Sequence, residues 1–201
     1  MPRPYEIVPL VERTDAWWEW RRSGIGSSDA ATILGAKPSK SAERLLVDKQ
    51  HPRKNRERDF ARQRIADLER AARAHYGRTF QVSVEPACVQ SIARPWQRAS
   101  LDGLSADGER AVETKCGPAA YRSAAARGRP PSHHLAQLQH ILAVTSLPAI
   151  DYWCYCPPHA PLRLEIPRDE AYIERLLIAE EIFWKRFPTE PAPADRDELR
   201  K

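Results

Sequence analysis

The sequence has no run of 18 apolar residues, so no membrane-spanning helix is expected. Its first residues, Met-Pro-Arg-Pro-Tyr-Glu, lack the apolar core of a secretory signal peptide, which favours a cytoplasmic location. No internal repeat is present. A chain of 201 residues is long enough to bury one proper core. We therefore expect a single domain over residues 1–187, with a flexible C-terminal tail over 188–201.

Cysteine is scarce: the chain has only four, Cys88, Cys116, Cys154 and Cys156. They lie mostly in apolar, strand-like runs, which favours reduced, buried thiols. A Cys-x-Cys pair could instead bind a metal or an iron–sulfur cluster. Its spacing, however, matches no usual ligand pattern.

Acidic residues are outnumbered by basic ones, and the formal net charge is +5. A modest basic bias fits a polyanionic partner such as nucleic acid. The bias is strongest over residues 53–64, which carry six basic and two acidic residues. Such a run is either a solvated face or a set of phosphate contacts.

Two short extended runs, 98–105 and 111–116, flank an Asp107-Gly108 pair, a strong signal for a β-hairpin. Because side chains alternate along a strand, Glu113 and Lys115 are expected on one face. The opposite face, with Val112, Thr114 and Cys116, is expected to meet the core.

Asp102 lies on the partner strand, where a plausible register places it opposite Glu113. Two carboxylates and an amine at one strand end would suit a hard divalent cation with an adjacent proton acceptor. An exposed ion pair is the plainer interpretation, because a Glu-x-Lys pattern is common by chance.

A second candidate site lies near the N-terminus. Thr14 and Asp15 predict a helix start, and Arg21 is four residues beyond Trp17, on the same helical face. Residues 24–35 then predict a short helix that begins at Ser27, Ser28 and Asp29. Its free N–H groups and hydroxyls, together with Arg21, would form an anion pocket. Ordinary helix capping is the alternative.

The remaining pattern predicts helices over residues 41–49, 60–76, 121–129, 132–144 and 168–187, and strands over 81–84, 87–92, 150–156 and 162–166. In the helix over 60–76 the expected inward stripe is Ile65, Leu68, Ala72 and Tyr76. In the last helix it is Tyr172, Leu176, Ala179, Phe183 and Phe187. Glu69 lies beside the first stripe, so it needs either a salt-bridge partner or a metal. Gln137 and Gln139 interrupt an otherwise apolar helix that Ser132 is expected to cap.

Several of these pieces occur together in one known family. They are Asp15-Ala-Trp17, Arg21, Ile25-Gly-Ser-Ser-Asp29, Leu68-Glu69, Ser100-Leu-Asp-Gly103, Glu113-Thr-Lys-Cys116 and Ala136-Gln-Leu-Gln139. In this order they resemble the bacteriophage lambda exonuclease or YqaJ-type viral recombinase family, within the PD-(D/E)XK nuclease superfamily. The resemblance covers about residues 15–187. The chain departs from the family pattern at Ile65, where a glycine is usual, and at Leu101 and Gly117, where prolines are usual.

The resemblance implies an α/β (α+β mixed) fold in which helices flank a central mixed β-sheet. It also implies a magnesium- or manganese-dependent 5′→3′ exonuclease with two ions, acting on ends of linear double-stranded DNA and leaving 3′ overhangs for recombination. Further implications are a ring-shaped homotrimer, a single-strand annealing partner, and a phage or prophage protein in the bacterial cytoplasm.

The same resemblance implies roles for individual residues. Asp102, Glu113 and the backbone carbonyl of Thr114 would bind metal, and Glu69 would reach a second ion or its water. Lys115 would orient or deprotonate the attacking water, and Gln137 would arrange the site. Arg21, Ser28 and Ser100 would hold a 5′-terminal phosphate.

Two rival interpretations remain at this point. One is a related nuclease of other polarity or endonuclease habit, including Cas4-like enzymes with an iron–sulfur cluster. The other is a DNA-binding module that keeps the nuclease fold without catalysis.

Overall fold

The computed structural model describes residues 3–37, 39–51 and 59–187, without the side chains of 59–64. The expected tail over 188–201 and the basic side chains of 53–64 therefore lie outside the described residues. Among the helices that the structure describes, none is long and apolar enough to cross a membrane.

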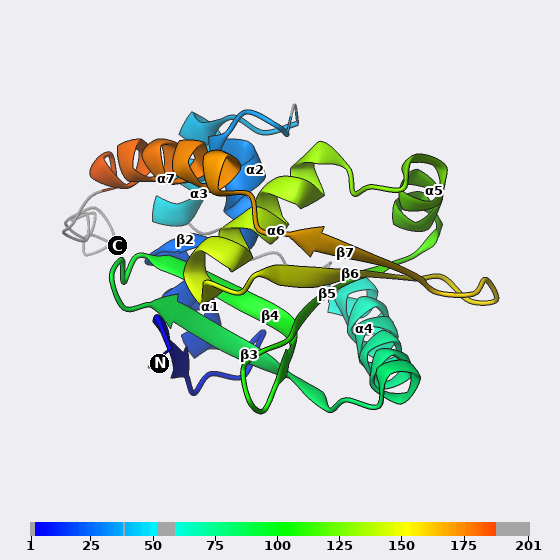
Figure 1. The fold of residues 1–201 in the computed structure, drawn as a ribbon. Coiled ribbons are helices and arrows are strands. Elements are labelled where there is room, and N and C mark those ends of the chain that lie inside the picture. Colours follow the sequence, from blue (N-terminus) through cyan, green and yellow to red (C-terminus); the bar gives the residue numbers. More distant parts are fainter. Residues whose placement is uncertain (1–2, 38, 52–58, 188–201) are drawn as a thin grey trace, which may run out of the picture.

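The described chain builds one mixed sheet (Figure 1). Its strands are β1 (Tyr5–Val8), β2 (Ile25–Gly26), β3 (Val84–Ser91), β4 (Gln97–Ser105), β5 (Ala111–Cys116), β6 (Ala149–Tyr155) and β7 (Leu162–Pro167). The order is β1-β3-β4-β5-β6-β7, and β2 pairs beside β4. The β5–β6 and β2–β4 pairs are parallel, and the others are antiparallel.

Helices cover both faces of this sheet. They are α1 (Asp15–Arg22), the 3₁₀ turn η1 (Ser27–Asp29), α2 (Ala30–Ile33), α3 (Ala42–Gln50), α4 (Asp59–Phe80), α5 (Pro118–Arg127), α6 (Ser132–Thr145) and α7 (Glu170–Lys185). Helix α6 packs on one face with α7 and α2 beyond it, and α4 packs on the other (Figure 1). The structure thus has the expected α/β architecture, a central mixed sheet flanked by helices.

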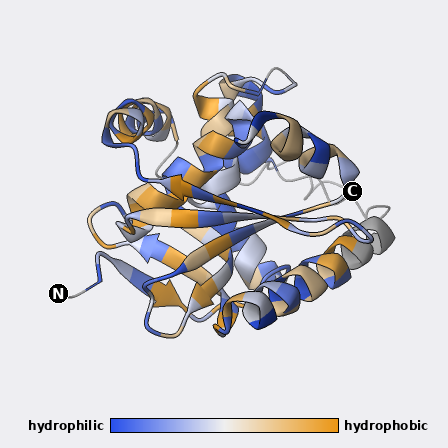
Figure 2. Ribbon diagram, turned by 45° about the vertical axis from the view of Figure 1, so that its right-hand side comes forward, coloured by the Kyte–Doolittle hydropathy of each residue, from blue (hydrophilic) through white to orange (hydrophobic). Residues whose placement is uncertain are grey.

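Strand β5 lies between two hydrophobic clusters. Ala111 faces the α6 side, where it joins Leu138 and Ile141, whereas Val112 faces α4 and joins Tyr76. Hydrophobic residues accordingly lie along the central strands in Figure 2. Burial on both faces fixes the register of β5, because a slip by one residue would exchange its two faces. The strand is therefore a rigid support for side chains at its end.

The predicted hairpin is confirmed between β4 and β5. Gly103 pairs with Val112 in an antiparallel register, and the turn closes through a hydrogen bond from the Gly108 N–H to the Ser105 carbonyl at 2.8 Å. Gly108 has a φ of +75°, a conformation that glycine adopts without the cost of a side chain. The Asp107-Gly108 pair therefore predicted the turn correctly, because the turn needs the positive φ that glycine adopts.

The predicted apolar stripe of α4 is only half right. Ala72 and Tyr76 are fully buried, but Ile65 and Leu68 are 49% and 41% exposed. Helical spacing shows which residues share a face, but not how far along the helix the packing partner extends. Ala72 and Tyr76 pack against the strand residues Val84, Val112 and Trp153, a cluster that does not include Ile65 or Leu68.

Element boundaries also differ from the prediction. Strand β3 begins at Val84 rather than at residue 81, because Gln81 adopts a left-handed conformation with φ +52°. Helix α5 begins at Pro118 rather than at residue 121. Ser132 is the first residue of α6 rather than its cap, and Pro131 occupies the N-cap position without a side-chain hydrogen bond. In α7, Leu176 and Phe183 are buried as predicted, together with Ile173 and Glu180. The other predicted positions, Tyr172, Ala179 and Phe187, are half-buried.

Candidate active site

Asp102 is held against the neighbouring strand. Its Oδ2 accepts hydrogen bonds from the backbone N–H and the hydroxyl of Thr114, at 2.7 and 2.8 Å. Arg73 of α4 donates to the Asp102 backbone carbonyl at 3.1 Å. The strands approach closely here, since a Cβ added at Gly103 would lie 2.7 Å from Val112. These contacts fix the position of the Asp102 carboxylate.

Glu113, Lys115 and Gln137 form one hydrogen-bonded cluster, as their predicted positions on one face allow. Glu113 Oε1 accepts from Lys115 Nζ at 2.6 Å and from Gln137 Nε2 at 2.7 Å. Lys115 Nζ also donates to Gln137 Oε1 at 3.1 Å. Glu113 is only 3% exposed, and within the described part of the chain its Oε2 is buried without a hydrogen-bond partner. The plain alternative of an exposed surface pair is thus wrong.

The charges of this cluster are strongly coupled. The pKa of Glu113 is raised to about 7, chiefly by burial and then by the nearby Asp102 carboxylate, although the charge and the hydrogen bond of Lys115 lower it. For Lys115, burial lowers the pKa, but Glu113 and Asp102 outweigh burial and raise it above its ordinary value. Lys115 is therefore protonated at neutral pH, and in this state it orients its partners rather than accepting a proton.

Two further acids approach from other elements. Glu69 of α4 pairs with Arg13 at 2.7 Å, and its pKa is raised by burial and by Asp102. The pKa of Glu12 is raised by burial and then by Asp102 and Glu69, so Glu12 lies near both carboxylates. Sequence reasoning missed Glu12, and no spacing rule connects this loop residue to the β4–β5 hairpin.

Within the described residues, no three acidic, histidine or cysteine side chains gather as a group that could enclose a metal ion. The residues nevertheless fit a divalent cation. Glu113 presents a buried oxygen without a partner, and Asp102 and Glu69 raise its pKa through repulsion that a cation would offset. Carboxylate oxygens are also the ligands that hard cations prefer. Metal binding by these acids stays a prediction.

The predicted phosphate-binding residues come together around a tryptophan. Arg21 Nη2 contacts the hydroxyl of Ser28, and its guanidinium lies over the Trp17 ring, 5.0 Å from the centroid. Trp17 Nε1 donates to Ser100 Oγ at 2.9 Å. Trp17 thus joins Arg21 to Ser100. The sequence had indicated only that Trp17 shares a face with Arg21.

The anion pocket predicted at the N-terminus of the helix that begins at Ser27 does not have the expected free N–H groups. Segment 27–33 is a 3₁₀ turn followed by a four-residue α2, too short for a strong helix dipole. The Gly26 N–H is donated to Asp29 Oδ2 at 2.9 Å, so it is not free for an anion. An anion here would depend on Arg21 and the hydroxyls.

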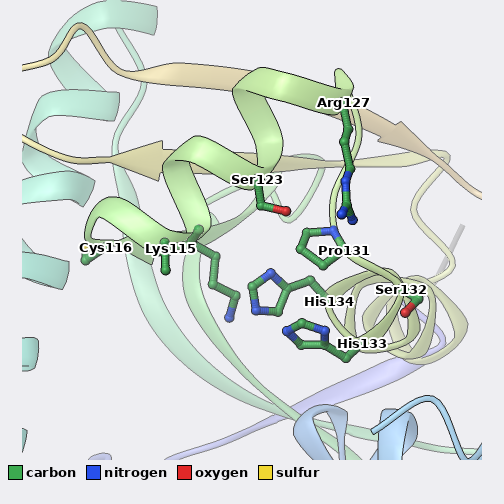
Figure 3. A pocket seen from close by; sticks show the side chains of 10 residues that line it. Lys115, Cys116, Ser123, Arg127, Pro131, Ser132, His133 and His134 are labelled. Atoms are coloured by element: carbon green, nitrogen blue, oxygen red, sulfur yellow. The ribbon is translucent and has the colours of Figure 1, made fainter.

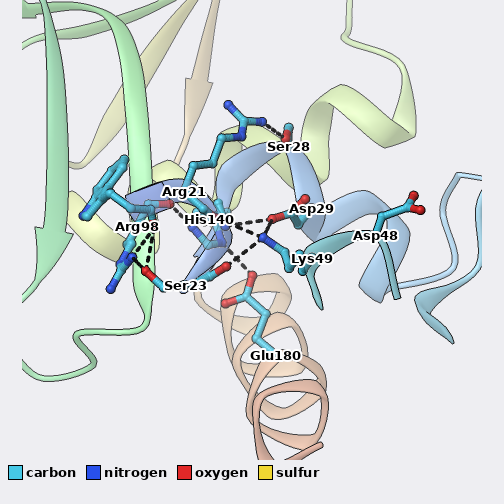
Figure 4. Close-up of polar contacts among 12 residues, drawn as sticks. Arg21, Ser23, Ser28, Asp29, Asp48, Lys49, Arg98, His140 and Glu180 are labelled. Carbon is cyan, nitrogen blue, oxygen red and sulfur yellow. Dashed lines mark hydrogen bonds and ion pairs between the residues drawn. The ribbon is translucent and has the colours of Figure 1, made fainter. Parts of the chain in front are cut away.

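Lys49 of α3 holds this loop in place (Figure 4). Its Nζ pairs with Asp29 at 2.8 Å and donates to the carbonyls of Arg21 and Gly24 at 3.1 and 2.7 Å. Burial alone would raise the pKa of Asp29, but it is lowered because the Lys49 and Arg21 charges, with the hydrogen bonds from Lys49 and the Gly26 N–H, together outweigh burial. One buried lysine therefore connects the backbone that carries Arg21 with the loop that carries Ser28.

A buried ion pair between His140 and Glu180 lies next to the loop that Lys49 holds (Figure 4). His140 Nδ1 lies 2.6 Å from Glu180 Oε1, and its Nε2 lies 2.9 Å from the Arg98 carbonyl (Figure 4). Both ring nitrogens face acceptors, so the ring needs both protons. Gln97 Nε2 donates to the other Glu180 oxygen at 2.8 Å. This network joins α6 and α7 to β4.

The network predicts how stability depends on pH. Burial lowers the pKa of His140, but Glu180 outweighs burial and raises it above the ordinary 6.5. Because the pKa of His140 is higher in the folded protein, the protonated ring stabilises the fold. This stabilisation is fully present below pH 6.5 and is lost as pH rises through the folded-state pKa. In urea titrations at several pH values, Glu180→Gln should remove this decline and cost about 3 kcal/mol or more at low pH. The control is Glu181→Gln, at the exposed neighbour. An unchanged pH profile in Glu180→Gln would contradict the prediction.

Gln139, the second glutamine of α6, has a structural role. It donates to the Pro167 carbonyl at 2.9 Å and accepts from the Asp169 N–H at 3.0 Å. It therefore fixes the connection from β7 to α7, away from Glu113. All four cysteines are free, as expected, and none forms a disulfide.

A cavity opens beside Lys115 (Figure 3). It has a volume of about 600 Å³ and lies between α5 and the start of α6. Lys115 and Cys116 form its wall on the β5 side, and His133 and His134 line it from α6. No sequence pattern indicated this cavity, because its walls come from three separate elements.

Comparison with known proteins agrees with this fold. A family model described as the YqaJ-like viral recombinase domain matches residues 16–148, about two thirds of the chain. An alkaline exonuclease (LHK-Exo) from Laribacter hongkongensis has a TM-score of 0.73 at 22% identity, covering 87% of this chain and 92% of that one. Its complex with dAMP also has a TM-score of 0.73, at 23% identity and the same coverage, 87% and 92%.

A phage-related exonuclease from Haemophilus somnus 129PT is more distant, with a TM-score of 0.54 at 12% identity over 81% of this chain and 94% of that one. No curated protein matches. At these identities the structural likeness establishes the fold, whereas the family model rests on the sequence itself. The chain belongs to the YqaJ-like viral recombinase family.

Proposed function

We propose that this protein is a metal-dependent deoxyribonuclease that degrades the 5′-ended strand of linear double-stranded DNA. The observation that carries the proposal is the buried Glu113–Lys115–Gln137 cluster beside Asp102, in a chain of this family. Solved relatives of the same fold are described as exonucleases, one of them in complex with dAMP.

The chain's own groups prepare the site for hydrolysis. Gln137 fixes the rotamer of Glu113 from α6, and Thr114 fixes Asp102 from β5. Such support keeps the reacting groups in position without reorganisation during the reaction. The charged Lys115 ammonium would orient the attacking water or the phosphate oxygen that gains charge.

Asp102, Glu113 and the Thr114 carbonyl, with Glu69 further out, are the groups that would hold one or two Mg²⁺ or Mn²⁺ ions. Two such ions supply an activated water and stabilise the leaving oxygen. Glu69 would have to exchange its ion pair with Arg13 for a role at the metal.

The direction in which the strand is degraded would follow from the second cluster of residues, around Arg21. Arg21, Ser28 and Ser100 would hold the terminal 5′-phosphate, and Ser100 stands two residues before Asp102 on the same strand. A phosphate held there would place the first internal ester near Glu113. Degradation would therefore proceed 5′→3′ and leave 3′ single-stranded overhangs.

Recombination by strand annealing uses such overhangs, so a single-strand annealing protein is the proposed partner. We also propose a homotrimeric ring, which would keep the enzyme on its DNA.

The test uses linear duplex DNA labelled at either the 5′ or the 3′ end, with magnesium, and with phosphate or hydroxyl at the 5′ terminus. We expect the 5′ label to appear first as mononucleotide, faster from phosphorylated ends, and no hydrolysis in EDTA. Release of the 3′ label first would show that degradation has the opposite polarity. Cleavage of a closed circle would indicate an endonuclease. DNA binding without any hydrolysis would contradict the nuclease function and support the alternative of a non-catalytic DNA-binding module.

A further inference from the structure

The cavity beside Lys115 adjoins the proposed active site, because Lys115 lies in its wall and donates to Glu113 Oε1. At about 600 Å³ it is within the range that accommodates ligands of nucleotide size. Its polar groups come from three elements: Lys115 from β5, Ser123 and Arg127 from α5, and Ser132, His133 and His134 from α6. In Figure 3 these side chains surround one space, with Arg127 opposite the two imidazoles.

The charge of the lining favours an anion. Lys115 and Arg127 are cations, and of the described residues that line the cavity none is acidic. Burial, with Lys115 and other nearby charges, lowers the pKa of His134 to about 3. The pKa of His133 is lowered by burial, Lys37 and Lys115. Both imidazoles are uncharged at neutral pH, so they offer hydrogen bonds while Arg127 supplies the charge on the far wall.

The cavity and the Arg21 cluster lie on opposite sides of the proposed reacting groups. Ser100 belongs to β4, which pairs with β5 on one side, whereas α5 packs over β5, β6 and β7 on the other. Lys115 stands between them, at the end of β5. The chain turns directly from β5 into α5 through Gly117, whose φ of +103° disfavours any other residue. The position of Arg127 relative to Lys115 is thus set by one short, rigid helix.

We propose that this cavity binds the DNA strand on the 3′ side of the bond that is cut, with Arg127 contacting the next backbone phosphate. The proposal rests on the proposed nuclease function and adds a second phosphate contact to it. One strand would then be held on both sides of the reacting ester, by Arg21 before it and by Arg127 after it. Holding both sides restricts the ester to the orientation in which it reacts.

The test measures binding in EDTA, so it does not depend on hydrolysis. A 5′-phosphorylated duplex is compared with one whose second internucleotide linkage is a neutral methylphosphonate. Wild-type protein should bind the modified duplex about tenfold more weakly, since one charge-assisted contact is lost. Arg127→Ala should bind both duplexes equally weakly, and its slope of log affinity against log salt should fall by about 0.9, one phosphate contact.

Arg122→Ala is the matched control, because it removes the same charge from an exposed position of the same helix, outside the cavity lining. It should retain the wild-type discrimination between the two duplexes. If Arg127→Ala still discriminates between them as wild type does, or behaves like Arg122→Ala, the proposal is overturned. Failure of hydrolysis in wild-type protein would refute the nuclease function alone, since the binding result is obtained without metal.

Discussion

Glu113→Gln is expected to lower the rate of DNA hydrolysis by about 10³-fold or more while leaving duplex binding nearly unchanged. The amide retains an oxygen for Lys115 and Gln137, which hydrogen-bond to Glu113 Oε1. It replaces the second oxygen, Oε2, which is buried without a partner among the described groups. The variant therefore keeps the packing and loses the charge that would bind a cation, a contribution worth several kcal/mol to such a reaction.

The measurement is single-turnover hydrolysis of end-labelled duplex, with binding followed separately by fluorescence anisotropy. Glu109→Gln is the control, because it removes the same charge from the exposed turn of the same hairpin. Thermal unfolding with and without magnesium gives a second readout: the ion should stabilise the wild type and not Glu113→Gln. Hydrolysis within tenfold of wild type would show that Glu113 is not at the reacting centre.

The sequence predicted the Glu113 cluster because its geometry is local. A hairpin at Asp107-Gly108 fixes the register, and strand alternation then places Glu113 and Lys115 together. Gln137 comes from a distant helix, and residue spacing alone did not connect it to β5. Only the family resemblance made that link, and the hydrogen bonds at 2.7 and 3.1 Å agree with it.

What the sequence did not predict depends on contacts between distant segments. Glu12 approaches Asp102 from a loop, Lys49 crosses from α3 to the loop that carries Ser28, and Glu180 meets His140 inside the core. Each is a charged residue whose pattern suits an exposed position, so propensity and periodicity assign it to the surface. Burial of such groups is favourable only with partners. The partners of Lys49 are 20 to 28 residues away in the sequence, and His140 is 40 residues away from Glu180.

The same limit explains the exposed half of α4. Ile65 and Leu68 have the correct spacing for a buried stripe, yet they remain exposed and do not join the cluster that packs α4 against the sheet. Their exposure is a property of the tertiary fold that periodicity does not contain.

Arg21→Ala is expected to remove the preference for 5′-phosphorylated ends. In the wild type, a charge-assisted, two-pronged contact with a terminal phosphate should favour phosphate over hydroxyl by about 10- to 100-fold in kcat/KM. Arg21 is held for this contact by the Trp17 ring and by Ser28. Without the guanidinium, both kinds of end should react at the slow rate of the hydroxyl end, because Glu113 and Lys115 are unchanged.

Arg21→Lys separates charge from geometry. A lysine keeps the positive charge but loses the planar fork, so an intermediate preference is expected. Arg22→Ala, which removes the adjacent charge on α1, should leave the preference intact. If Arg21→Ala still prefers phosphorylated ends as strongly as wild type, the terminal phosphate is held elsewhere. The polarity would then need another cause than the Arg21, Ser28 and Ser100 cluster, although hydrolysis at Glu113 would stand.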